Sequence, residues 1–378
     1  MINIHLYPSP FLNESRILRE ANSLSRLMLF DRIDLVGIAH EGEAPTEELQ
    51  RDIKIVRVGR CRGTGLLTKL MSTSQWSTAV LQRYRNEDVG CINCHSVATL
   101  PVGVMLKRAT GAKLVYDTHE LETETNGLKG IRKYLTKRAE RALIGYADHC
   151  IFVGTAIEKW YVREYGLDNT TVLYNCPPRR AITPTDYFRE KFSIRSDIPI
   201  FLYQGVIGTG RGIPKLIEAF SSLAEQAALI VMGYGSLAGW TAREATKFPS
   251  IFFHPAVKPD CLLDYTAAAD FGVSMIEATS LSYDYCMPNK LFEYVMANKP
   301  VLVSPTKEQS DFVRNYGIGE VASDMTPALI RGAVLNLLSR DRRALQVALE
   351  RTANEYCWEG QQPKLEAVYL SSLGMRSR

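Results

Sequence analysis

Short runs of β-branched and aliphatic residues alternate with longer amphipathic stretches along the whole chain. In the first half such runs predict strands at Ile2–Leu6, Ile33–Ile38, Ile53–Val58, Cys91–Cys94, Lys113–Asp117, His149–Val153 and Thr171–Tyr174. The stretches between them, such as Ser15–Leu29 and Leu128–Ile144, carry apolar residues at helical spacing. This alternation is typical of βαβ units around a mostly parallel sheet.

The alternation stops at residues 175–187, where NCPPRRAITPTDY combines prolines with polar residues and predicts a connection between domains. A second series then predicts strands at Ile198–Tyr203, Ala228–Met232, Ile251–Phe253, Phe271–Met275 and Pro300–Ser304. Helices are expected at Thr326–Leu338 and Asp341–Glu355, and again after Trp358. The pattern predicts two α/β halves of similar size, with a ligand in the cleft between them at the carboxyl ends of the strands.

Length and composition agree with this interpretation. A chain of 378 residues suits two domains, and 46% hydrophobic with 23% charged residues is a globular composition. The formal net charge of +4 is too small to indicate nucleic-acid binding. MINIHLYPSPF at the start is not a signal peptide, and no apolar run is long enough to span a bilayer. We expect a cytoplasmic protein, attached to a membrane at most from one side.

The eight cysteines are spread along the chain, mostly within apolar runs, which predicts reduced core residues. Cys91 and Cys94 form a CxxC pair, but no second pair follows at zinc spacing. We therefore expect no metal at this pair.

The segment YCMPNKLFEYVMANKPVLVS, residues 285–304, carries the strongest chemical signal. Pro288 suits the first turn of a helix over Asn289–Ala297, and the N–H groups at a helix start bind phosphate well. Lys290 adds a positive charge, and Glu293, one turn further, can accept two hydroxyl groups of a ribose. An ordinary amphipathic helix with a solvated glutamate is the alternative. The expected amide donors are Met287, Asn289, Lys290 and Leu291.

This segment resembles the signature of retaining GT-B glycosyltransferases, specifically family 4. The resemblance implies that Glu293 binds the ribose of a nucleotide sugar. The family's other glutamate, eight positions earlier, corresponds to Tyr285 here. Tyr285 and Pro288 are included among the expected donor contacts.

The segment FLYQGVIGTGRGIPKLIEAF, residues 201–220, resembles the strand, glycine loop and helix that open the second domain of this family. Gly208 and Gly210 would let the backbone approach a diphosphate, and Arg211 would neutralise it. The family's second basic residue corresponds to Val206, so Lys215 or Lys290 is the candidate replacement. A dinucleotide-binding loop is the alternative, but GTGRG is not G-x-G-x-x-G. Gly233, in MGYGSL, and Val257, near the nucleobase, complete the predicted donor site.

The acceptor site is expected in the first half. The strand in AKLVYDTHELETE ends at Asp117 and is followed by His119 and Glu120. The resemblance implies that His119 contacts the transferred sugar. Weaker candidates for acceptor contacts are Asn13, Glu14, Arg16, His95 and Glu120. A structural histidine and a solvated helix start are the alternatives.

Two segments combine basic with apolar residues, residues 127–145 and 61–85. Such faces suit an anionic membrane surface, and a helix packed on the sheet with a solvated basic face is the alternative. In the first of them the apolar positions at helical spacing are Leu128, Ile131, Leu135, Ala139 and Leu143.

The resemblance covers nearly the whole chain and implies two Rossmann-like domains that face each other across a cleft. The acceptor domain would comprise residues 1–175, joined by a final helix over 358–378, and the nucleotide-sugar domain residues 190–357. We expect a retaining, metal-independent transfer from a UDP-sugar, or a GDP-sugar, to a hydroxyl of a glycan or lipid-linked acceptor. His119, Arg211 and Glu293 are the expected catalytic residues. The alternatives are a weakly catalytic scaffold subunit that binds nucleotide sugars and another GT-B enzyme such as an epimerase.

Overall fold

The computed structural model describes residues 1–12, 14–39, 42–60, 65–183 and 185–375. The chain divides into two compact units. Unit 1 comprises Met1–Leu173 with Gln362–Arg378, and unit 2 comprises Tyr174–Gln361. The second passage between the units falls within one helix, α15 (Trp358–Ser372).

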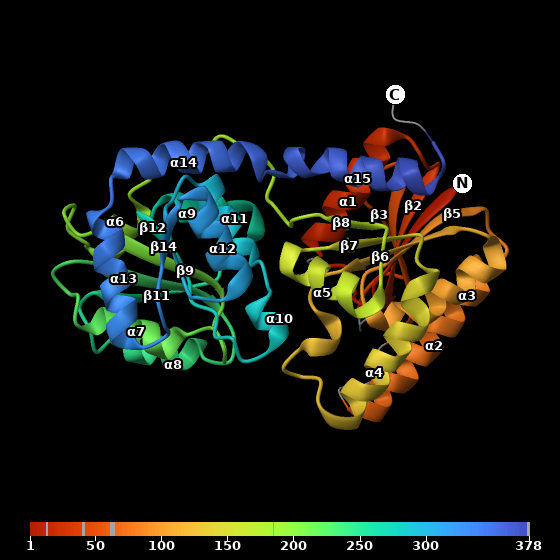
Figure 1. Ribbon diagram of the computed structural model, residues 1–378, viewed down its shortest axis with the longest axis horizontal. Helices are drawn as coiled ribbons and strands as arrows, with labels where there is room; N and C mark the ends of the chain where they lie inside the picture. The colour runs from red at the N-terminus through yellow and green to blue at the C-terminus, as the bar shows by residue number, and fades with distance from the viewer. Residues whose placement is uncertain (13, 40–41, 61–64, 184, 376–378) are drawn as a thin grey trace. The chain divides into compact units, whose positions relative to one another are not determined.

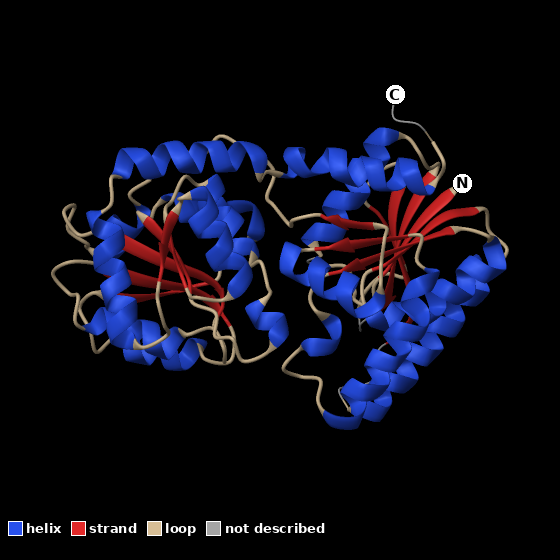
Figure 2. Ribbon diagram, in the orientation of Figure 1, coloured by secondary structure: helices blue, strands red, loops and turns tan. Residues whose placement is uncertain are grey.

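Unit 1 is built on one eight-stranded sheet with the order β3-β4-β2-β1-β5-β6-β7-β8 (Figures 1 and 2). Its strands are β1 (Ile2–Leu6), β2 (Arg32–Ala39), β3 (Thr46–Glu48), β4 (Ile53–Arg60), β5 (Val89–Cys94), β6 (Lys113–Thr118), β7 (His149–Phe152) and β8 (Thr170–Val172). Neighbouring strands are parallel except for β3 against β4. The α-helices are α1 (Ser15–Leu27), α2 (Leu66–Tyr84), α3 (Leu100–Thr110), α4 (Gly130–Leu143) and α5 (Thr155–Tyr165).

Unit 2 contains a six-stranded sheet that is parallel throughout, with the order β11-β10-β9-β12-β13-β14. Its strands are β9 (Ile200–Val206), β10 (Ala228–Tyr234), β11 (Ile251–Pro255), β12 (Phe271–Ser274), β13 (Val301–Val303) and β14 (Gly319–Val321). The helices are α6 (Tyr187–Phe192), α7 (Ile213–Ser221), α8 (Ala238–Ala245), α9 (Leu262–Ala267), α10 (Leu281–Asp284), α11 (Asn289–Met296), α12 (Lys307–Tyr316), α13 (Pro327–Ser339) and α14 (Arg342–Glu355).

Every strand expected from the sequence is present, with shifted ends in several cases. Two further strands, β3 and β14, were not predicted. Each has three residues, and β3 is fully exposed, so neither carries the apolar run that marks a buried strand. The structure thus confirms two mostly parallel α/β sheets.

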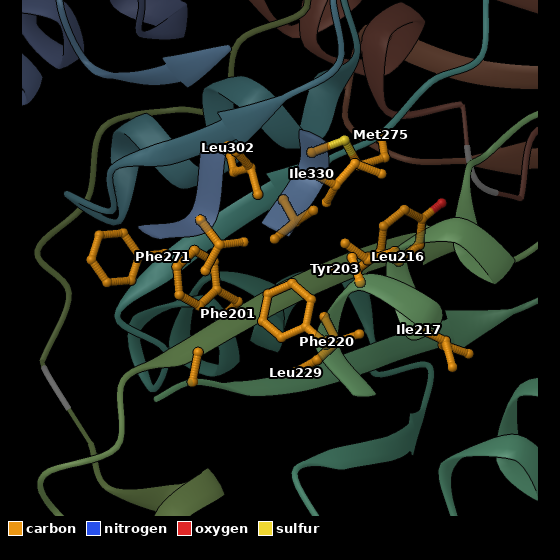
Figure 3. Close-up of a cluster of buried hydrophobic side chains, with 14 of the residues drawn as sticks. Phe201, Tyr203, Leu216, Ile217, Phe220, Leu229, Phe271, Met275, Leu302 and Ile330 are labelled. Atoms are coloured by element: carbon orange, nitrogen blue, oxygen red, sulfur yellow. The ribbon is translucent and has the colours of Figure 1, made fainter. Parts of the chain in front are cut away.

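The core of unit 2 lies between its sheet and the helices α7 and α13 (Figure 3). The rings of Phe201 and Phe271 stack at 4.6 Å on adjacent strands, and Phe220 of α7 meets Phe201 edge-on at 5.3 Å. Because apolar side chains fill this layer, the polar residues that follow β9, β10 and β12 gather at the carboxyl edge of the sheet.

Cys91 and Cys94 are buried on β5 as free thiols, and burial raises the pKa of the Cys94 thiol to about 12. Within the described parts of the chain, no helix is long and apolar enough to cross a membrane.

Candidate active site

The first feature of the candidate site is the start of α11 in unit 2. Pro288 is the N-cap, and the helix begins at Asn289, as the sequence predicts. The first amides of a helix have no acceptor within it, which leaves those of Asn289 and Lys290 available to a ligand. The prediction that the Leu291 amide is available to a phosphate is wrong, because this amide donates to the Pro288 carbonyl at 3.0 Å.

Glu293 lies one turn into α11 and is braced from the sheet. The Nε2 of Gln204, on β9, donates to Glu293 Oε2 at 2.6 Å. Thr266 in α9 holds Gln204 from the other side by donating from Oγ1 to its Oε1 at 2.9 Å. The carboxylate is therefore fixed in direction by two neighbouring elements. The sequence analysis missed Gln204, although a buried amide within the apolar strand FLYQG is a visible signal.

Lys290 projects towards β9 and is half-buried. Its Nζ lies 3.7 Å from the centroid of the Tyr203 ring, a cation–π distance. Burial, assisted by the charge of Arg211, lowers the pKa of Lys290 to about 7. The amine can therefore gain a proton when an anion arrives beside it.

The loop between β9 and α7 brings Arg211 to the same edge of the sheet. The guanidinium lies 4.8 Å above the ring of Tyr283, which follows β12. Gly210 makes this possible, because it has φ 77° and a Cβ there would lie 2.8 Å from the Tyr283 ring. Gly208 accepts a hydrogen bond from the Arg211 amide at 3.3 Å, which closes the turn.

Gly233 ends β10 beside Gly205 of β9. A Cβ on Gly233 would lie 1.8 Å from the Gly205 carbonyl oxygen, so glycine is required for the two strand ends to pack. Val257 lies half-buried in the loop after β11, and Tyr285 lies half-buried as the C-cap of α10. Both belong to connections that leave the carboxyl edge of the sheet.

Lys215 is less available to neutralise a diphosphate than the sequence suggests. Its Nζ pairs with Glu277 Oε1 at 2.8 Å, and Glu277 itself follows β12. Val206, at the end of β9, is 44% exposed. Of the two candidates for the replacement charge, Lys290 lies close to the glycine turn, with Nζ 3.8 Å from the Cβ position of Gly205. Lys215 has its charge compensated by Glu277.

The carboxyl edge of the unit 1 sheet contains a buried charge cluster around Asp117. Arg16 donates to it from two nitrogens, at 3.0 and 2.8 Å. Arg16 also donates to the Leu173 carbonyl at 2.8 Å and lies 3.0 Å from Glu20. The pKa of Asp117 is held well below its usual range by Arg16 and by the histidines beside it, while burial and Asp117 raise that of Glu20.

Three histidine rings extend this cluster. His95 Nδ1 lies 3.1 Å from Asp117 Oδ2 and 3.2 Å from His119 Nε2, and its Nε2 lies 2.8 Å from His5 Nδ1. Burial lowers the pKa of His95 to about 4 and that of His5 well below its usual value. His119 keeps 26% of its side chain exposed, beside the ring of Tyr7 at 5.5 Å. His119 is thus the member of the cluster that reaches the surface.

These groups include combinations that could ligate a metal ion, such as His95, Asp117 and His119. However, Arg16 already supplies a positive charge to both oxygens of Asp117. A second cation on the same carboxylate would be repelled. The donor set therefore fits a hydrogen-bonded network better than a metal centre.

The predicted acceptor contacts divide into two groups. Glu14 is half-exposed at the N-cap of α1, and Glu120 is exposed after β6. Arg16 and His95 are buried, and their polar atoms contact other members of the cluster, so the structure contradicts a direct acceptor contact for these two. Asn13 lies outside the described residues.

The helix α4 is unusually exposed. Glu140 is its one fully buried residue and accepts hydrogen bonds from the hydroxyls of Tyr116, Tyr161 and Tyr165 at 2.7 to 2.8 Å. Two apolar side chains of the helix, Ile131 and Leu135, are 68% and 58% exposed. The expected apolar stripe is therefore present at the surface, whereas α4 is anchored to the unit through a carboxylate.

The second basic segment, residues 61–85, was also expected to present basic and apolar side chains to a membrane surface, and the structure agrees only in part. Residues 61–64 lie outside the described residues. Trp76 is buried, and its Nε1 donates to the Gly37 carbonyl at 2.8 Å, so it cannot contact a membrane. Met71, on the same helix, is 62% exposed.

Comparison with known proteins places the chain in a class. A family model described as Glycosyltransferase Family 4 matches residues 14–176, and one described as Glycosyl transferases group 1 matches residues 198–340. Solved structures with the same fold include GT-B glycosyltransferases. The fold is GT-B, and the chain belongs to the group 1 glycosyltransferases that these two models describe.

Similar structures span nearly the full chain at low identity. Sucrose-phosphate synthase from Thermosynechococcus elongatus has a TM-score of 0.82 at 16% identity and covers 99% of each chain. Anabaena HepE in complex with UDP-glucose has a TM-score of 0.75 at 14% identity, and the match covers 98% of this chain and 100% of HepE. WaaG, a glycosyltransferase involved in lipopolysaccharide biosynthesis, has a TM-score of 0.66 at 14% identity, and the match covers 97% of this chain and 99% of WaaG. No curated protein matches the sequence.

Proposed function

We propose that this glycosyltransferase moves a sugar from UDP to a hydroxyl of a glycan or lipid-linked acceptor, with retention at the anomeric carbon and without a metal ion. The observation that carries the proposal is the braced carboxylate in unit 2. Gln204 fixes the Glu293 carboxylate by a hydrogen bond. Glu293 lies one helical turn after the amides that begin α11. A ribose bound by Glu293 would leave its diphosphate at those amides, beside Lys290 and Arg211.

The choice of UDP rests on relatives. HepE was solved with UDP-glucose, and its fold matches over nearly the whole of both chains. A GDP-sugar is the second candidate, because the described residues around Val257 do not by themselves select a base. The acceptor class is supported by WaaG, whose role is in lipopolysaccharide biosynthesis.

The proposed mechanism stabilises the departing diphosphate with fixed positive groups. Arg211, Lys290 and the first amides of α11 would meet the charge that develops as the glycosidic bond breaks. The leaving phosphate oxygen would accept the proton of the attacking hydroxyl on the same face of the sugar. His119 would contact the sugar from unit 1, and Glu14 and Glu120 are the remaining acceptor contacts.

A thermal-shift panel with UDP, GDP, ADP, CMP and their sugar conjugates tests the donor site. At 100 times its dissociation constant a ligand adds about 2.7 kcal/mol of stability, which is a shift of several degrees. We expect one diphosphate to stabilise the wild type and to stabilise Glu293→Ala much less. Stabilisation by no nucleotide would contradict the proposal.

Product analysis separates the proposed reaction from its alternatives. Release of UDP with transfer to an added acceptor excludes a scaffold subunit, and the anomeric configuration of the product reports retention. Turnover that persists in EDTA supports metal independence. An altered sugar still linked to the nucleotide would indicate an epimerase instead.

We also propose that α4 docks on an anionic membrane surface. Ile131, Tyr134 and Leu135 expose apolar area, and three basic residues beside them form no ion pair with any described residue: Lys129, Arg132 and Arg138. Apolar side chains inserted among lipids and basic residues at headgroups would act together.

Vesicle sedimentation tests this docking. The wild type should bind phosphatidylglycerol-containing vesicles more than neutral ones, and the double variant Ile131→Ser/Leu135→Ser should bind less. Val347→Ser removes a similarly exposed side chain from α14, outside both basic segments, and is the matched control. Equal binding by both variants would contradict the role of α4.

A further inference from the structure

The cluster at the carboxyl edge of the unit 1 sheet holds its surface histidine by one particular nitrogen. His119 Nε2 lies 3.2 Å from His95 Nδ1 and 3.5 Å from Asp117 Oδ2. His119 Nδ1 has no partner among the described residues, and it is not among the buried atoms that lack one. The ring therefore points its Nε2 inward and its Nδ1 to the surface.

The charges of the cluster determine where its protons lie. Asp117 is ionised, because Arg16 donates to both of its oxygens, so it can only accept hydrogen bonds. His95 is neutral and carries one proton. The 3.1 Å contact with Asp117 requires that proton on Nδ1, which leaves the His95 Nε2 as an acceptor.

The remaining histidine agrees with this assignment. The acceptor at His95 Nε2 needs a donor, and His5 Nδ1 lies 2.8 Å away. A neutral His5 with its proton on Nδ1 has a bare Nε2, and this atom is buried without a partner. An unpartnered lone pair costs less here than the reverse arrangement, in which His95 and Asp117 would face each other without a proton between them.

We propose that His95 and Asp117 are positioning residues that hold the His119 ring with its Nε2 accepting from His95, so that the proton of His119 lies on Nδ1 and is presented as a hydrogen-bond donor to a hydroxyl of the bound sugar. The Nδ1–H of His95 is shared between Asp117 Oδ2 at 3.1 Å and His119 Nε2 at 3.2 Å, and the rings of the two histidines pack with centroids 5.2 Å apart. This inference rests on the proposed role of His119 in binding the sugar, and it assigns the two buried groups that the acceptor site does not use.

The ring packing limits how His119 can turn. The centroid of the Tyr7 ring lies 5.5 Å from that of His119, and the centroid of the His95 ring lies 5.2 Å from it. Removing the His95 ring would leave Asp117 one donor short and His119 Nε2 without the donor that fixes its tautomer. A surface histidine released in this way would sample both tautomers and several ring orientations.

The ligand-free test is nitrogen NMR of the full chain labelled in its six histidines. Long-range proton–nitrogen spectra distinguish protonated from bare ring nitrogens, and His119→Gln identifies the signals of His119. We expect a protonated Nδ1 and a bare Nε2 in the wild type, and averaged signals in His95→Leu. A His119 protonated on Nε2 in the wild type would overturn the proposal.

The kinetic test uses release of UDP from UDP-glucose. His95→Leu should lower kcat by about tenfold to hundredfold, as is typical when a residue that orients a functional ligand is lost. The Kd of UDP, which lacks the transferred sugar, should not change. His95→Asn places an amide donor where His95 Nδ1 stands, and it should recover kcat to within a few fold of the wild type.

His149→Gln is the matched control, because His149 bonds to Thr171 at 2.9 Å elsewhere in the same sheet. Unchanged kcat in His95→Leu, together with impaired His119→Ala, would overturn the positioning role alone. Unimpaired His119→Ala, or a wild type that neither binds nor consumes the nucleotide sugar, would overturn the proposed function. The NMR result would still decide how His119 is held.

Discussion

The carboxyl edges of the two sheets are built in different ways. In unit 2 the edge consists of glycine turns, helix-start amides and the long side chains of Lys290 and Arg211. In unit 1 the same edge is filled by side chains that bond to each other, with Arg16 and Asp117 at its centre. Unit 2 is thus arranged to receive an external anion, whereas unit 1 already contains its own counter-ion.

This difference separates two tasks of a transferase. A site that holds a diphosphate needs positive groups whose charge is not already compensated. A site that holds a neutral sugar hydroxyl needs one hydrogen-bonding atom fixed in direction, and a rigid internal network supplies that. The comparison therefore predicts large stability effects for changes in unit 1 and mainly binding effects for changes in unit 2.

The largest effect is expected for Arg16→Met. The change would leave Asp117 buried at 1% exposure without its cation, which typically costs about 3–5 kcal/mol. The unfolding temperature of unit 1, measured by calorimetry, should therefore fall by roughly 10 °C.

Arg26→Met is the control on the same helix, because Arg26 is exposed in the last turn of α1. The double variant Arg16→Met/Asp117→Asn should recover part of the loss, since the buried charge is also removed. Equal unfolding temperatures for Arg16→Met and Arg26→Met would show that the cluster is not a stabilising core of unit 1.

The next effect concerns Glu293→Ala in unit 2. Loss of a carboxylate that accepts from two ribose hydroxyls should raise the Kd of UDP by about tenfold to a hundredfold. The unfolding temperature without ligand should change little, because Glu293 is half-buried at the edge of the sheet. Isothermal titration calorimetry measures the first quantity and a thermal scan the second.

Glu218→Ala removes an exposed carboxylate from α7 in the same unit and should leave the Kd unchanged. Gln204→Leu should raise the Kd by a smaller factor, because it removes the brace but not the carboxylate. If Glu293→Ala destabilised the ligand-free chain as strongly as Arg16→Met, the contrast between the two edges would be lost.

A third effect is the pH dependence of donor binding. The pKa of Lys290 is lowered to about 7 by burial and by Arg211. A diphosphate favours the protonated amine, so binding takes up a proton above pH 7. The Kd of UDP-glucose, whose phosphates do not titrate in this range, should be constant below pH 6. It should rise by up to about tenfold per pH unit between pH 7 and 8.5.

Lys290→Met should bind UDP-glucose more weakly at pH 6, and its Kd should no longer rise with pH. Arg211→Met should bind more weakly but keep a slope that begins at higher pH, because Arg211 is one cause of the lowered pKa. A flat profile in the wild type would show that Lys290 does not face the diphosphate.

The two edges also differ in how far the sequence predicts them. The donor edge could be predicted because its parts are local, as glycines, a proline and Lys290 lie within short segments of known spacing. Its errors are local too, such as the Leu291 amide that bonds to Pro288. The parallel sheets were predicted for the same reason, since each strand except β3 and β14 lies within a short segment of strand-forming residues.

The unit 1 cluster could not be predicted, because its contacts join residues far apart in the chain. Arg16 and Asp117 are separated by 101 positions, and His5 and His95 by 90. A polar residue at a helix start or strand end looks the same in the sequence whether it faces solvent or a buried partner. Arg16 and His95 were therefore expected at the surface, where the acceptor would lie.

The smallest effect is expected for Val206→Arg, which tests whether unit 2 can accept a further positive group. Val206 ends β9 and stands where the resembling family has a basic residue. A partly exposed charge pair contributes about 0.2–1 kcal/mol, so the Kd of UDP should fall by a factor of about 1.4 to 5. Leu329→Arg, on α13 with the same 44% exposure, adds the same net charge elsewhere and should leave the Kd unchanged. A similar gain in both variants would reflect net charge alone. A loss in Val206→Arg would indicate that Lys290 and Arg211 already occupy the space around the diphosphate.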